Sequence, residues 1–88
     1  MLNREQILDA VLDSVAETLS VPLGGLSEHT LIREDLEADS MDVVTLMILL
    51  DDKFDAEFKP EDIPDRAISI GWVVDYIIEK LPKAANEA

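Results

Sequence analysis

The chain has 88 residues, no cysteine, and 20 acidic against 7 basic residues, which gives a formal net charge of −13. The missing cysteines exclude disulfides, thiolate metal sites and thiol catalysis. The negative charge argues against nucleic acid and anionic membranes as partners. The length suits one domain over residues 1–88, and 48% hydrophobic residues suffice for a core. Because there is neither a bilayer-spanning apolar run nor a signal-peptide pattern, we expect a cytoplasmic protein without membrane insertion.

The first predicted element is an amphipathic helix. Asn3 and Gln6 have the spacing of a capping box and open it. A long connection from Ser20 to Asp39 follows, and in a small domain such a connection is usually functional or packed on itself. The apolar stripe of the helix consists of Ile7, Leu8, Val11, Leu12, Val15 and Leu19.

The spacing predicts a second helix from about Ser40 to Asp55, with two apolar stripes instead of one. One is an ordinary core stripe. The other lies on the opposite side, where it is either covered by the long connection or exposed as a docking surface rimmed by charge. The core stripe contains Val43, Leu46, Met47, Leu50 and Phe54, and the second contains Met41, Val44 and Ile48, bordered by Asp42, Asp51, Asp52 and Asp55.

Two further elements are predicted towards the C-terminal end. Residues 60–66 hold at most one short turn of helix because of Pro64. Ser69 caps a last helix that runs to about Lys80, and we expect residues 82–88 to be a frayed tail. No strand alternation occurs, so the predicted fold is all-α. The predicted core contains Leu8, Leu12, Val15, Leu19, Leu46, Met47, Leu50, Phe54, Val74 and Ile77.

Ser40 has a setting that no other serine of the chain shares. Residues 34–65 contain 12 acids and 2 bases, and Ser40 lies among them at a helix start. Such acidity either solubilises the protein or steers basic partners towards it. A serine at a helix start is usually the cap, but Asp39 already supplies a good cap. The Ser40 hydroxyl is then free near the positive end of the helix dipole, which suits a phosphate ester.

Motifs for catalysis are missing from the chain. Its one histidine, His29, lies in the long connection without a nucleophile motif, and a lone loop histidine is usually a plain surface residue. There is no glycine-rich phosphate loop and no EF-hand spacing. We therefore predict no catalytic residues and no specific metal site, although weak binding of divalent cations by clustered carboxylates stays open.

Residues 35–42, Asp-Leu-Glu-Ala-Asp-Ser-Met-Asp, resemble the Asp-Leu-Gly-x-Asp-Ser-Leu motif of acyl carrier proteins. Residues 50–58 resemble the family's Leu-Glu-x-x-Phe continuation, and residues 69–70 and 74–77 resemble its last helix. The resemblance implies an antiparallel four-helix bundle with a short third helix. It also implies a single acyl carrier domain whose Ser40 bears 4′-phosphopantetheine, taken from coenzyme A. The arm would carry acyl intermediates as thioesters, and the protein itself would not be an enzyme.

The resemblance also implies partners. A holo-carrier-protein synthase would install the arm. Acyl-transferring and chain-elongating enzymes of fatty-acid, related lipid or polyketide synthesis would dock through basic surfaces onto a monomer. The residues expected to bind these partners are Asp39, Met41, Asp42, Val44, Ile48, Asp51 and Asp52.

Some residues depart from the family pattern and leave the cargo and pathway open. Glu37 replaces the usual glycine, Thr45 stands where a glutamate is common, Leu49 is larger than the usual residue, and Lys53 interrupts the acidic run. Two other hypotheses remain. One is an unmodified structural subunit of a larger complex, which a mass spectrum would reveal. The other is an acidic helical adaptor or ion buffer, which would be indifferent to Ser40→Ala.

Overall fold

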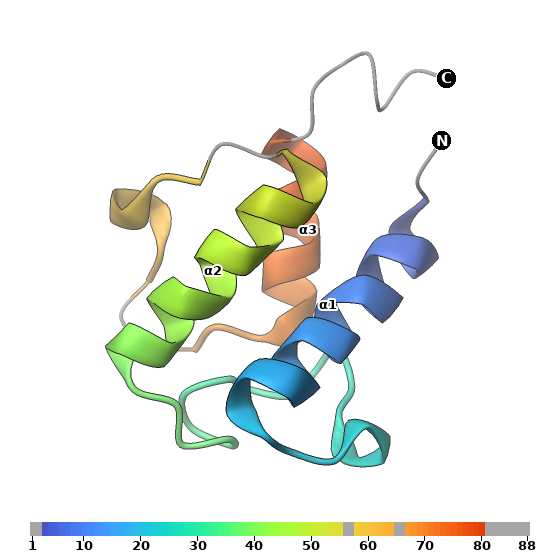
Figure 1. The fold of residues 1–88 in the computed structure, drawn as a ribbon, viewed down its shortest axis with the longest axis vertical. Helices are drawn as coiled ribbons and strands as arrows, with labels where there is room; N and C mark the ends of the chain where they lie inside the picture. The colour runs from blue at the N-terminus through green and yellow to red at the C-terminus, as the bar shows by residue number, and fades with distance from the viewer. Residues whose placement is uncertain (1–2, 56–57, 65–66, 81–88) are drawn as a thin grey trace.

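The computed structural model describes residues 3–55, 58–64 and 67–80 (Figure 1). This part of the chain forms three α-helices and two short 3-10 turns, with no strand beyond one isolated bridge between Leu31 and Ser69. The all-α prediction is therefore confirmed. In chain order the elements are α1 (Arg4–Leu19), η1 (Leu23–Gly25), α2 (Ser40–Phe54), η2 (Pro60–Asp62) and α3 (Ile70–Lys80).

The first helix, α1, packs against both α2 and α3, whereas η2 lies on the side of α2 away from α1 (Figure 1). The predicted capping box is present: Gln6 N–H donates to Asn3 Oδ1 over 2.8 Å, and Asn3 N–H donates to Gln6 Oε1 over 3.0 Å. The buried face of α1 comprises Ile7, Val11, Ser14 and Val15. The core prediction was therefore only partly right here, because Leu8, Leu12 and Leu19 pack on the core while partly exposed.

The second helix, α2, starts at the predicted residue and ends one residue earlier than predicted, with Asp55 as a left-handed cap. Its core stripe is confirmed for four residues, since Val43, Leu46, Met47 and Leu50 are buried. Phe54 is only partly buried at the end of the helix. The α2 helix thus turns one apolar face to α1 and the core and leaves the other for the surface.

The long connection before α2 is packed on itself and on the start of α3. Ile32 N–H donates to Ile68 O over 2.8 Å, and Ile70 N–H donates to Thr30 O over 3.0 Å. Both Ile32 and Ile68 are fully buried, although neither was in the predicted core. Gly71 N–H donates to the carbonyl of Glu28, and a Cβ at Gly71 would lie 3.1 Å from that oxygen. The close approach therefore favours glycine at this position.

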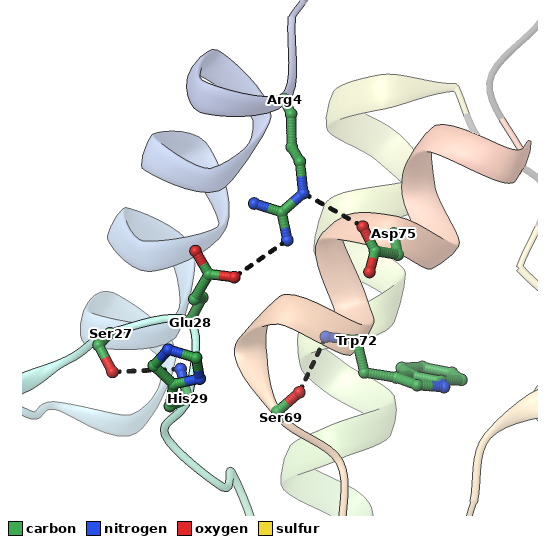
Figure 2. Close-up of polar contacts among 7 residues, drawn as sticks. All are labelled: Arg4, Ser27, Glu28, His29, Ser69, Trp72 and Asp75. Carbon is green, nitrogen blue, oxygen red and sulfur yellow. Dashed lines mark hydrogen bonds and ion pairs between the residues drawn. The ribbon is translucent and has the colours of Figure 1, made fainter.

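The third helix, α3, opens as predicted, because Ser69 Oγ accepts a hydrogen bond from Trp72 N–H over 2.9 Å (Figure 2). The buried residues of α3 are Ile70, Gly71, Val73, Val74, Tyr76 and Ile77, so a broad face of this helix lies in the core. The short turn predicted within residues 60–66 corresponds to η2. The predicted tail over residues 82–88 lies outside the described residues.

Arg4 joins three parts of the chain on the surface. Figure 2 shows its guanidinium between two carboxylates: Nη2 donates to Glu28 Oε1 and Nε donates to Asp75 Oδ1, each over 3.2 Å. Hydrogen bonding to Glu28 and then to Asp75 raises the pKa of Arg4, so this cation stays charged. The contact connects the first turn of α1 to the long connection and to α3.

Candidate functional site

Ser40 occupies the first position of α2 and is exposed. Asp39 caps the helix: Asp42 N–H donates to Asp39 Oδ1 over 2.8 Å, and Asp39 N–H donates to Asp42 Oδ2 over 3.3 Å. Among the described residues, none forms a hydrogen bond with the Ser40 hydroxyl. As expected from the sequence, Asp39 and not Ser40 serves as the cap.

The position of the Ser40 hydroxyl suits an anionic ester. The first backbone N–H groups of a helix lack partners within the helix, and the aligned peptide dipoles make this end partly positive. A phosphate oxygen attached here would lie near those N–H groups. The site can therefore present a nucleophilic hydroxyl to an enzyme and stabilise the phosphodiester that results.

An exposed apolar strip runs along α2 from the residue next to Ser40. The sequence left open whether these side chains are covered, and the structure answers that they are not. Met41 is 71% exposed, Val44 37% and Ile48 62%. Leu49, which was not among the predicted docking residues, is 46% exposed and widens the strip.

Acidic side chains border the apolar strip. Asp39 and Asp52 are exposed, and Asp42 and Asp51 are half-buried. All four lie in or next to α2, so the predicted docking residues share one helix with Ser40. Charge surrounding an apolar centre is the usual organisation of a protein-binding surface.

Two cavities open between α2 and residues of the connections that face it. The first, of about 170 Å³, lies beside Ser40 and is lined by Arg33, Ser40, Val43, Val44, Ile63, Pro64 and Ile68. The second, of about 80 Å³, is lined by Val44, Met47, Ile48, Asp51, Phe58 and Ile63. Because Val44 and Ile63 line both, the cavities are neighbours along one face of α2.

Several lining residues were missed by the sequence analysis. Arg33, Phe58, Ile63 and Ile68 lie in connections, where helical periodicity does not predict which way a side chain faces. Arg33 is the one charged residue among the described residues around the cavity beside Ser40. The available signal for Arg33 in the sequence was the presence of a basic residue directly before the acidic residues 34–65.

Other predicted features lie apart from Ser40 or form no site in the structure. His29 is an exposed residue whose backbone N–H donates to Ser27 Oγ over 3.1 Å (Figure 2). Asp51, Asp52 and Asp55 line a shallow depression with Ile48. Within the described ranges, no three His, Cys, Asp or Glu side chains converge as metal ligands. No described helix has the length and apolarity needed to cross a bilayer.

Comparison with known proteins gives consistent matches. The family model described as the phosphopantetheine attachment site matches residues 9–77. An acyl carrier protein of Campylobacter curvus is 46% identical over 77 residues, which cover 88% of this chain and 97% of that protein. An acyl carrier protein of Campylobacter fetus is 44% identical over 71 residues, covering 81% and 91%. One from Lactobacillus acidophilus is 33% identical over 76 residues, covering 86% and 94%.

Proposed function

The chain belongs to the acyl carrier protein family, and we propose that its 4′-phosphopantetheine arm is attached to Ser40. Proteins of this family are carriers and not enzymes, and the group that they carry is phosphopantetheine. One observation carries the assignment to Ser40. Its hydroxyl is exposed at the first position of α2, while Asp39 has taken over the capping role that a serine there would otherwise have.

The same geometry explains what Ser40 contributes to loading. A holo-carrier-protein synthase must bring coenzyme A to a hydroxyl that it can reach without opening the fold. The Ser40 oxygen attacks the phosphorus of coenzyme A that bears the pantetheine group, and its proton passes to a base of the synthase. The pyrophosphate P–O bond of coenzyme A breaks, and adenosine 3′,5′-bisphosphate leaves. The N-terminal N–H groups of α2 then lie near the resulting phosphodiester and favour its negative charge.

We propose that partner enzymes dock on α2. The apolar strip of Met41, Val44 and Ile48, widened by Leu49, would form the centre of the contact. A surrounding group of carboxylates would meet a basic surface and steer the encounter. That group consists of Asp39, Asp42, Asp51 and Asp52.

The cargo would be an acyl intermediate of fatty-acid synthesis, or of a related lipid or polyketide pathway. The cavity lined by Met47, Phe58 and Ile63 is mostly apolar, which suits a hydrocarbon chain. The cavity beside Ser40 would receive the part of the arm nearest the phosphate, since it contains both the attachment residue and Arg33. The acyl chain would then be shielded from water between α2 and residues 58–64.

We further propose that residues 1–88 form a single domain that acts as a monomer in the cytoplasm. The described helices share one core, which supports a single folding unit. The η2 turn would correspond to the short third helix of the antiparallel four-helix bundle that the family resemblance implies. An unmodified acidic adaptor or structural subunit is the alternative, and it needs no modified serine.

The test is mass spectrometry after incubation with coenzyme A and a phosphopantetheinyl transferase. The parent protein should gain one arm of about 340 Da as a covalent modification. Ser40→Ala should gain none. Ser27→Ala removes another exposed hydroxyl and should be modified like the parent. An arm on Ser40→Ala, or no arm on the parent, would contradict the proposal.

A further inference from the structure

Tyr76 connects α3 to the segment that faces α2 across the apolar cavity. Its hydroxyl donates a hydrogen bond to Asp62 Oδ2 over 2.9 Å. The same hydroxyl accepts a hydrogen bond from Lys59 N–H over 3.2 Å. Both partners belong to residues 58–64, so one side chain of α3 holds this segment at two points.

The ring of Tyr76 contacts Phe58 of the same segment and two residues of α3. It stacks on Phe58 with a centroid distance of 5.1 Å and on Trp72 at the same distance, with interplanar angles of 14° and 10°. The ammonium of Lys80 lies 5.5 Å from the Tyr76 ring centroid and 3.7 Å from Asp62 Oδ2. Tyr76 is only 7% exposed, whereas the side chains of Asp62 and Lys80 keep 37% and 27% of their surface exposed.

The segment held by Tyr76 forms one wall of the apolar cavity. Phe58 and Ile63 line that cavity opposite Val44, Met47 and Ile48 of α2. At about 80 Å³ the cavity is small. A longer acyl chain must therefore push residues 58–64 away from α2, and that movement strains the contacts of Tyr76.

We propose that Tyr76 is a positioning residue that sets how far residues 58–64 can yield, and thereby the length of acyl chain that the protein shelters. The inference rests on the proposed carrier function with cargo beside α2. Short chains enter without disturbing the Tyr76 hydroxyl. Long chains enter at the expense of its hydrogen bonds to Lys59 and Asp62.

The chain contains a single tyrosine and a single tryptophan, so both ends of the stack can be observed without added labels. Trp72 fluorescence reports its contact with the Tyr76 ring. Exchange of the Lys59 amide hydrogen reports its hydrogen bond to the Tyr76 hydroxyl. These signals can be compared in the holo protein and in forms loaded with a butyryl or a decanoyl chain.

The decisive variant is Tyr76→Phe, which keeps the stacked ring and removes the hydroxyl. In the parent, decanoyl loading should speed exchange at Lys59 roughly fivefold over butyryl loading, the factor that about 1 kcal/mol represents. In Tyr76→Phe, exchange at Lys59 should be fast in every form and independent of chain length. Asp62→Ala, which changes only an exposed side chain, should have the same effect in part. Glu61→Ala removes a neighbouring acid of the same turn and should behave like the parent.

Failure of this inference can be distinguished from failure of the proposed function. If mass spectrometry finds no arm on Ser40, the carrier proposal fails. If Ser40 is loaded and acylated but the parent and Tyr76→Phe respond identically to chain length, the role of Tyr76 is wrong. Should Tyr76→Phe not fold, the comparison of Asp62→Ala with Glu61→Ala decides in the same way.

Discussion

The ammonium of Lys53 donates a hydrogen bond of 3.1 Å to the hydroxyl of Ser14, which joins the last turn of α2 to the middle of α1. Ser14 is 3% exposed and lies in the interface between these helices. The base that interrupts the acidic run of α2 is therefore engaged within the protein. Its ammonium is directed to α1 and not to the apolar strip that begins beside Ser40.

This contact predicts unequal effects for its two partners. Lys53→Met leaves the buried Ser14 hydroxyl without its donor and should cost about 1–3 kcal/mol in the free energy of unfolding. Ser14→Ala removes the hydroxyl and lets the ammonium turn to water, so its cost should be about 0.5–1.5 kcal/mol. Urea unfolding of both variants provides the measurement. Equal stability of the parent and Lys53→Met would show that the hydrogen bond contributes nothing.

Docking on α2 should depend on ionic strength. Steering by surface charge can raise association rates by roughly tenfold or more, and salt screens it. The initial rate of arm transfer at subsaturating protein should therefore fall as NaCl increases. Asp52→Asn should weaken this dependence, whereas Asp9→Asn on α1 should preserve it. A transfer rate that ignores NaCl would exclude electrostatic steering.

Leu50 and Phe54 should differ in their contribution to stability, although they share the apolar stripe of α2. Leu50 is completely buried, so Leu50→Ala should cost about 2–5 kcal/mol, which approaches the whole stability of a small domain. Phe54 packs on the core while partly exposed, and Phe54→Ala should cost less. Thermal and urea denaturation can rank the variants. The reverse order would mean that Phe54 faces the core more fully than Leu50 does.

Glu37 should be strained where the family motif has glycine. Its φ is 56°, in the left-handed region that costs a side chain with a Cβ about 1–2 kcal/mol. Glycine relieves this strain, but it also makes the unfolded chain more flexible, which cancels part of the gain in stability. Glu37→Gly should therefore raise the melting temperature, while Glu37→Ala, which removes the charge but keeps the Cβ, should not. A gain from alanine as large as that from glycine would assign the effect to charge.

Tyr76 should make stability fall in alkaline solution. Burial has the largest effect and raises the pKa of Tyr76. The hydrogen bond from Lys59 lowers this pKa, and the hydrogen bond to Asp62 raises it. The folded state therefore keeps the phenolic proton above pH 10, where the unfolded chain has lost it. This contribution is complete below about pH 10 and disappears as pH rises through the folded pKa.

The absorbance of tyrosinate gives this pKa directly, because the chain has one tyrosine. Parallel unfolding measurements should show a steeper alkaline loss of stability for the parent than for Tyr76→Phe. A Tyr76 titration at the ordinary value would contradict the burial of its hydroxyl.

The sequence predicted the features that depend on neighbours along the chain. Asn3, Asp39 and Ser69 each cap a helix through residues only three positions away, so the helix starts could be located. Ser40 and the apolar strip follow from the periodicity of the same helix. Periodicity cannot decide which of two adjacent residues of α1 faces the two helices that pack on it. In the structure Ile7 and Val11 are buried, whereas Leu8 and Leu12 are partly exposed.

The remaining features depend on how connections fold back, and no local pattern encodes them. The backbone of Ile32 pairs with that of Ile68, a residue 36 positions away in the chain. Arg33 and Ile63 are brought to the cavity beside Ser40 by the same long-range packing. The hydroxyl of Tyr76 likewise finds Asp62 only once α3 and η2 have been placed.

The reciprocal cap formed by Asp39 and Asp42 also affects what a partner encounters beside Ser40. Each carboxylate uses one oxygen to hold the backbone of the other residue, which fixes both rotamers and leaves the second oxygen of each for a basic group. The conformational entropy of these two side chains is thus lost on folding and not on docking. The anionic end of α2 is in this sense preorganised, and a partner recognises a rigid pair of oxygens instead of two mobile charges.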